Sequence, residues 1–82
     1  MIIQAKFSCK DLVGDIREGE YTVPEGATIE DAINVIYGEA GQNMTEGVRN
    51  SFVFLVGGLS AQWETVLKDG DKLRVLYRLL GG

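Results

Sequence analysis

Between residues 29 and 40 the chain carries a clear helical pattern of apolar positions. The apolar residues recur three and four positions apart, which places them on one face of an α-helix. They are Ile29, Ala32, Ile33, Ile36, Tyr37 and Ala40. Thr28 precedes them as a favoured N-cap residue, and Gly41 follows them as a favoured stop. We therefore expect one amphipathic helix that packs its apolar face against a sheet.

The other apolar segments alternate with a period of two or form short β-branched runs, as strands do. Residues 1–8 alternate, with Ile3, Ala5 and Phe7 on one face and Gln4, Lys6 and Ser8 on the other. Further strands are predicted over residues 21–23, 52–56, 59–63 and 72–77. The run 52–56 is apolar on both faces, which favours an interior strand and leaves open which face is exposed. Residues 42–51 are polar and are expected to form a loop.

The last predicted strand assigns its side chains to two faces. Leu73, Val75 and Tyr77 should point inward, whereas Lys72, Arg74 and Leu76 should point outward. In chain order the elements are a hairpin, a helix, a strand, a short strand and a final strand. A crossover helix after a hairpin lets the first and last strands lie parallel and central.

This order is the β-grasp arrangement, an α+β fold. We expect a mixed sheet of four to five strands with one main helix packed across it. One β-grasp domain should span residues 1–77, and residues 78–82 should form a flexible C-terminal tail.

Composition narrows the possible functions. With 82 residues the chain has room for one modest core, which disfavours a stand-alone enzyme with a deep pocket. A net charge of −4 disfavours a nucleic-acid partner, and no apolar run is long enough for a membrane helix. The chain has no histidine, and its single cysteine, Cys9, cannot form an internal disulfide. We expect a cytoplasmic protein without a metal site. We expect Cys9 to be a small apolar residue, and a sulfur-handling nucleophile is the alternative for it.

The candidate chemistry lies at the C-terminus, which reads Arg78-Leu79-Leu80-Gly81-Gly82. Glycine lacks a Cβ atom and holds no single conformation, so a glycine pair serves no folding purpose here. It does suit a tail that threads a narrow channel. Five extended residues span about 17 Å, enough to reach a nucleotide bound inside another protein.

A free carboxylate is a poor acyl donor, but conversion to an acyl-adenylate gives it a good leaving group. A sulfur nucleophile then yields a thiocarboxylate, and a lysine amine yields an amide. Either route needs a separate enzyme that uses ATP and magnesium. In this hypothesis the chain binds no cofactor itself and is a substrate, with the Gly82 carboxylate as the reacting group.

Four segments carry a family resemblance. They are the predicted first strand over residues 1–8, Val23-Pro24-Glu25-Gly26-Ala27-Thr28-Ile29-Glu30-Asp31, Leu67-Lys68-Asp69-Gly70-Asp71-Lys72-Leu73 and the terminal Gly81-Gly82. Together they resemble the MoaD/ThiS family of ubiquitin-like sulfur carriers. The resemblance implies that an E1-like enzyme adenylates Gly82 and that a sulfur donor converts it to a thiocarboxylate. It also implies delivery of the sulfur to a biosynthetic enzyme, for molybdopterin, for the thiazole of thiamine or for cysteine. The pathway stays open.

Two alternatives also stay open. Many molybdopterin-type members have a proline pair shortly before the diglycine, whereas this chain has Tyr77-Arg78-Leu79-Leu80. That ending is closer to the Arg-Leu-X-Gly-Gly of ubiquitin, so a protein modifier joined to lysines through Gly82 is one alternative. The other is a plain β-grasp binding domain.

The end of the chain also indicates a docking surface. Four of the eight basic residues lie between positions 68 and 78, a local excess in an acidic protein. Such an excess steers association with an acidic enzyme face. We expect Lys72, Arg74 and Leu76 to contact a partner. The activating enzyme should hold the tail residues Arg78, Leu79, Leu80 and Gly81.

Overall fold

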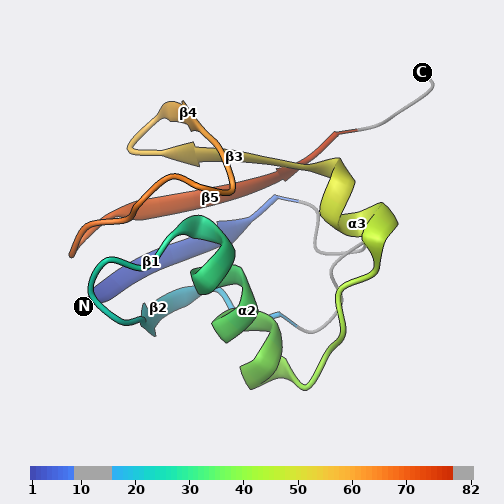
Figure 1. Ribbon diagram of the computed structural model, residues 1–82, viewed down its shortest axis with the longest axis horizontal. Coiled ribbons are helices and arrows are strands. Elements are labelled where there is room, and N and C mark those ends of the chain that lie inside the picture. The colour runs from blue at the N-terminus through green and yellow to red at the C-terminus, as the bar shows by residue number, and fades with distance from the viewer. Residues whose placement is uncertain (9–15, 79–82) are drawn as a thin grey trace.

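The computed structural model describes residues 1–8 and 16–78, and in these ranges it shows a mixed five-stranded sheet and two helices (Figure 1). The strands are β1 (Ile2–Phe7), β2 (Gly19–Thr22), β3 (Phe52–Val56), β4 (Leu59–Ala61) and β5 (Lys72–Tyr77). The helices are α2 (Ile29–Ala40) and α3 (Glu46–Ser51). Cys9 lies outside the described residues.

The sheet has the strand order β2-β1-β5-β3-β4, with β5 at its centre. β1 and β5 run parallel, in a register that pairs Ala5 with Leu73 and Phe7 with Val75. The other neighbouring strands pair antiparallel. The expected β-grasp topology, with the first and last strands parallel and adjacent, is therefore confirmed.

The capping signals read from the sequence act at both ends of α2. The Thr28 hydroxyl accepts a hydrogen bond from the Asp31 backbone N–H at 3.2 Å, and the Asp31 carboxylate accepts one from the Thr28 N–H at 3.0 Å. This reciprocal pair satisfies two backbone donors at the helix start. Gly41 has a φ of 66°, and its N–H donates to the carbonyls of the last turn. The helix thus begins and ends where the sequence predicts.

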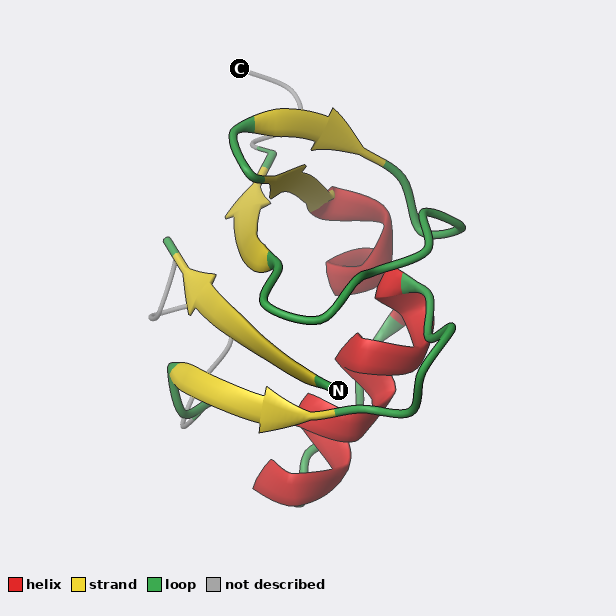
Figure 2. Ribbon diagram, turned by 90° about the vertical axis from the view of Figure 1, so that its left-hand side faces the viewer, coloured by secondary structure: helices red, strands yellow, loops and turns green. Residues whose placement is uncertain are grey.

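One hydrophobic core lies between the sheet and α2. Figure 2 shows both helices on one side of the strands. The predicted inward residues of β1 and the apolar face of α2 meet in this core, with only Ala40 partly exposed. β3 adds Phe52 and Phe54 to this core, so the face of β3 that carries these two side chains points inward. The opposite face, with Val53, is the exposed one. Trp63 closes one end of the core, with its ring centroid 4.7 Å from that of Phe54 in an edge-to-face contact.

The expectation of a loop holds for residues 42–45 and is wrong for residues 46–51, because α3 occupies Glu46–Ser51. Thr45 caps its first turn by accepting a hydrogen bond from the Val48 N–H at 3.2 Å. Arg49 ties α3 to distant elements, since it lies 3.2 Å from the Glu30 carboxylate and 4.2 Å from the centre of the Trp63 ring. Contacts with residues far apart in sequence thus stabilise α3. With six residues, the helix is too short to show a periodic pattern of apolar positions.

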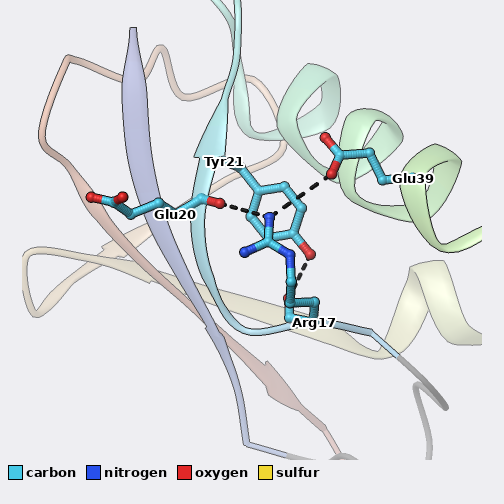
Figure 3. A network of polar contacts seen from close by, with 4 residues as sticks. All are labelled: Arg17, Glu20, Tyr21 and Glu39. Atoms are coloured by element: carbon cyan, nitrogen blue, oxygen red, sulfur yellow. Dashed lines mark hydrogen bonds and ion pairs between the residues drawn. The ribbon is translucent and has the colours of Figure 1, made fainter.

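β2 begins at Gly19, two residues earlier than predicted, and Arg17 lies beside its outer edge (Figure 3). Met1 and Val23 exchange both backbone hydrogen bonds. In an antiparallel pair of strands, hydrogen-bonded residues alternate with residues whose backbone groups point away from the neighbouring strand. Glu20, three residues before Val23, is of the second kind, so its carbonyl points away from β1. The Arg17 guanidinium donates to that carbonyl at 2.7 Å, lies 4.3 Å from the centre of the Tyr21 ring and approaches Glu39 of α2. The Arg17 side chain therefore satisfies a backbone carbonyl that the edge strand β2 would otherwise leave without a hydrogen bond from the sheet.

Neither helix of the described residues is long and apolar enough to cross a membrane.

Candidate docking face and tail exit

β5 presents the predicted partner-binding residues on the face of the sheet away from α2. Lys72 and Arg74 are exposed, as expected from the alternation. Leu76 is partly buried rather than fully exposed. Its partner in the antiparallel register is Val53 of β3, and adjacent side chains on one sheet face cover each other. All three predicted docking residues thus come from one strand and lie on one face.

The described part of the chain ends at Arg78, directly after β5. The Arg78 backbone N–H donates to the Ser51 carbonyl at 2.6 Å, which ties this point to the end of α3. The Arg78 residue as a whole is exposed. Leu79, Leu80, Gly81 and Gly82 lie outside the described residues. The structure therefore defines where the chain leaves the sheet, and the roles assigned to these four residues stay predictions.

The docking face includes residues that the sequence patterns did not assign to it. Lys6 of β1 stands opposite Arg74 in the parallel register, and Leu55 of β3 stands opposite Arg74 on the other side. Val53, 38% exposed, extends the apolar part of the same face. The alternation in β1 does place Lys6 outward. Its position beside Arg74 depends on a pairing between segments about seventy residues apart, which no local pattern reveals.

A surface hollow of about 520 Å³ lies at the start of β5, beside the β3–β4 turn. Its lining includes the three cations Lys6, Lys72 and Arg74, together with Leu55 and the turn glycines Gly57 and Gly58. Both glycines have positive φ, and an added Cβ would meet nothing within 4 Å. The turn therefore forms a wall of the hollow that carries no side chain.

Two carboxylates that could in principle hold a cation are engaged elsewhere. Asp69 accepts a hydrogen bond from the Ile2 N–H at 2.7 Å, and Asp71 accepts one from the Lys68 N–H at 2.7 Å. Both hydrogen bonds stabilise the turn before β5. Among the described residues, no three metal-ligating side chains cluster together.

Strand order, the parallel central pair and the helix across one face together define the β-grasp fold of ubiquitin-like proteins. The chain is similar over its full length to the crystal structure of SAMP1 from Haloferax volcanii, with a TM-score of 0.71, 18% identity and 100% of both chains covered. It is also similar to the solution structure of Urm1 from Trypanosoma brucei, with a TM-score of 0.65 and 20% identity over 99% of this chain and 95% of that one.

At these identities the similarity establishes the fold. The β-grasp fold that the sequence resemblance implies is thereby confirmed. No protein-family profile and no curated protein sequence matches the chain.

Proposed function

We propose that this chain is a sulfur carrier and that the Gly82 carboxylate is its working group. An E1-like enzyme binds the tail, and the carboxylate attacks the α-phosphorus of ATP. Pyrophosphate leaves, and an acyl-adenylate forms on Gly82. A hydrosulfide ion then attacks the carbonyl carbon, AMP leaves, and a thiocarboxylate remains for transfer to a biosynthetic enzyme. Magnesium belongs to the activating enzyme, where it neutralises the ATP phosphates.

The observation that carries the proposal is the route of β5. This strand lies at the centre of the sheet, and the exposed Arg78 follows it directly. A hydrogen bond from the Arg78 N–H to Ser51 anchors this point to the body of the protein. A rigid exit gives any partner that docks on the sheet face a fixed starting point for the tail, which limits the entropy lost on binding.

The fold supports the same class of function. SAMP1 and Urm1 are ubiquitin-like proteins of the sulfur-carrier and modifier type, and this chain shares their architecture over its full length. The modifier alternative uses the same adenylate, with a lysine amine in place of sulfur. The two functions therefore differ in the second nucleophile and share the first step.

Deletion of Gly82 tests this first step. We expect the deletion to abolish ATP–pyrophosphate exchange by the activating enzyme from the same cells, because the truncated chain ends one residue short of the nucleotide. The circular dichroism spectrum and the unfolding midpoint should not change, since the deletion removes no residue of a described strand or helix. Exchange at the original rate with the truncated chain would rule out both the carrier and the modifier.

A further inference from the structure

The short helix α3 depends on one long side chain for its contacts with distant segments. Of its six residues only Ser51 is buried, and Val48 is partly buried against the core. A helix of this length is unstable by itself in water. The Arg49 guanidinium lies 3.2 Å from the Glu30 carboxylate and 4.2 Å from the centre of the Trp63 ring. Stacking on a tryptophan face adds to an ion pair that solvent partly screens, so Arg49 largely determines how α3 is held.

The end of α3 is also the point at which the tail begins. The last carbonyls of an α-helix have no partner inside the helix. In α3 the Arg49 carbonyl accepts a hydrogen bond from the Phe52 N–H, which closes the last turn. The Ser51 carbonyl accepts its hydrogen bond from the Arg78 N–H, at 2.6 Å. Figure 1 shows α3 beside the end of β5, so the end of this helix sets the position of the residue that follows the strand.

We infer that Arg49 is a positioning residue for activation of the tail, although both helices lie on the side of the sheet away from the docking face (Figure 2). The inference rests on the proposed function, because the reaction that it affects is the adenylation of Gly82. The contacts of Arg49 hold α3 in place, and α3 presents the Ser51 carbonyl. That carbonyl then fixes Arg78. Arg49 acts through this chain of contacts and touches no reacting atom.

The benefit of a fixed Arg78 is entropic. Without its hydrogen bond, the backbone of this residue gains freedom that must be lost again when the enzyme binds the tail. Ordering the backbone of one residue weakens binding about fivefold to thirtyfold. This loss raises KM and leaves kcat unchanged, because the carboxylate attacks ATP from the same bound position once the tail is seated.

The variants Arg49→Ala and Arg17→Ala form a matched pair. Each removes an arginine that lies over an aromatic ring and pairs with a carboxylate, but Arg17 lies at the β2 edge. In the ¹⁵N-labelled chain, Arg49→Ala should speed amide hydrogen exchange at Arg78 roughly tenfold, whereas Arg17→Ala should leave it unchanged. In ATP–pyrophosphate exchange with the activating enzyme, Arg49→Ala should raise KM about fivefold at unchanged kcat.

The conservative variant Arg49→Lys gives a graded result and serves if Arg49→Ala does not fold. It keeps a positive charge beside Glu30 but lacks the planar guanidinium that stacks on Trp63. Its Arg78 exchange rate and its KM should both lie between those of Arg49→Ala and those of the unaltered chain.

Three results would overturn the inference. Unchanged exchange at Arg78 in Arg49→Ala would separate α3 from the tail exit, and a raised KM would then mean direct contact of Arg49 with the enzyme. An equal rise of KM in Arg17→Ala would show that general loss of stability explains the effect. A fall in kcat at unchanged KM would contradict a role in positioning.

The two readouts also separate this inference from the proposed function. Amide exchange needs no activating enzyme, so it decides the link between Arg49 and Arg78 by itself. If the unaltered chain is not adenylated, the proposed function fails whatever the amide exchange shows. If the unaltered chain is adenylated and Arg49→Ala has the same KM, the positioning role fails and the proposed function stands.

Discussion

Two buried tyrosines differ in what surrounds the hydroxyl group. The Tyr21 hydroxyl donates a hydrogen bond to the Arg17 carbonyl. The Tyr37 hydroxyl is buried and has no hydrogen-bond partner among the described residues. A buried polar group without a partner loses its hydrogen bonds to water and gains nothing in return. At the scale of single residues, the same side chain is thus stabilising at one position and unfavourable at the other.

Replacement of each tyrosine by phenylalanine should separate these two cases. Tyr37→Phe should raise the free energy of unfolding by about 0.5–1 kcal/mol, because it removes an unsatisfied buried group. Tyr21→Phe should lower it by about 1 kcal/mol, because it leaves the Arg17 carbonyl without its donor. Urea unfolding followed by Trp63 fluorescence measures both. A loss of stability in Tyr37→Phe as large as that in Tyr21→Phe would contradict this account of the hydroxyl.

The same pair of variants has a pH-dependent signature. Burial raises the pKa of Tyr37, and burial also dominates the raised pKa of Tyr21, where Arg17 opposes it and Glu39 adds to it. A raised folded-state pKa means that the neutral phenol is favoured on folding. Its contribution to stability is present below pH about 10, the unfolded value, and is lost as the pH rises through the folded value. Tyr37→Phe should therefore make the alkaline loss of stability less steep.

At the scale of elements, the sequence predicts what local chemistry determines. α2 could be predicted to the residue because Thr28, Gly41 and the apolar stripe all act within the helix. α3 could not, because Arg49 reaches Glu30 and Trp63 across the fold and the helix has six residues. A helix of that length is unstable by itself in water. The sequence does offer Thr45, a favoured N-cap residue directly before α3, whose hydroxyl accepts a hydrogen bond from the Val48 N–H.

Gly38 inside α2 and Gly41, which caps its C-terminal end, should respond in opposite ways to replacement by alanine. Gly38 lies inside the helix with nothing within 4 Å of an added Cβ, so Gly38→Ala should raise the free energy of unfolding by about 1 kcal/mol. Gly41 has a φ of 66°, so Gly41→Ala should lower it by about 1 kcal/mol. Denaturant unfolding checks both variants. An equal effect at the two positions would show that backbone conformation does not decide the outcome.

At the scale of the whole molecule, the protein is a thin body, 36 × 28 × 18 Å in extent, with helices on one side of its sheet (Figure 2). The alternation of apolar and charged residues in β5 is enough to place Lys72 and Arg74 on its outward face. The hollow that they form with Lys6 was not predictable, because it needs the register of β1 against β5 and the path of the β3–β4 turn. Long-range pairing, rather than local pattern, builds the docking face.

The intact mass of the protein purified from its own cells tests the central claim most directly. The account predicts a chain that ends at Gly82, with a population heavier by the difference between sulfur and oxygen. Fragmentation should place that difference on the last residue. A chain that continues past Gly82 in every form, or one found only in isopeptide conjugates and never with the added sulfur mass, would contradict the sulfur carrier.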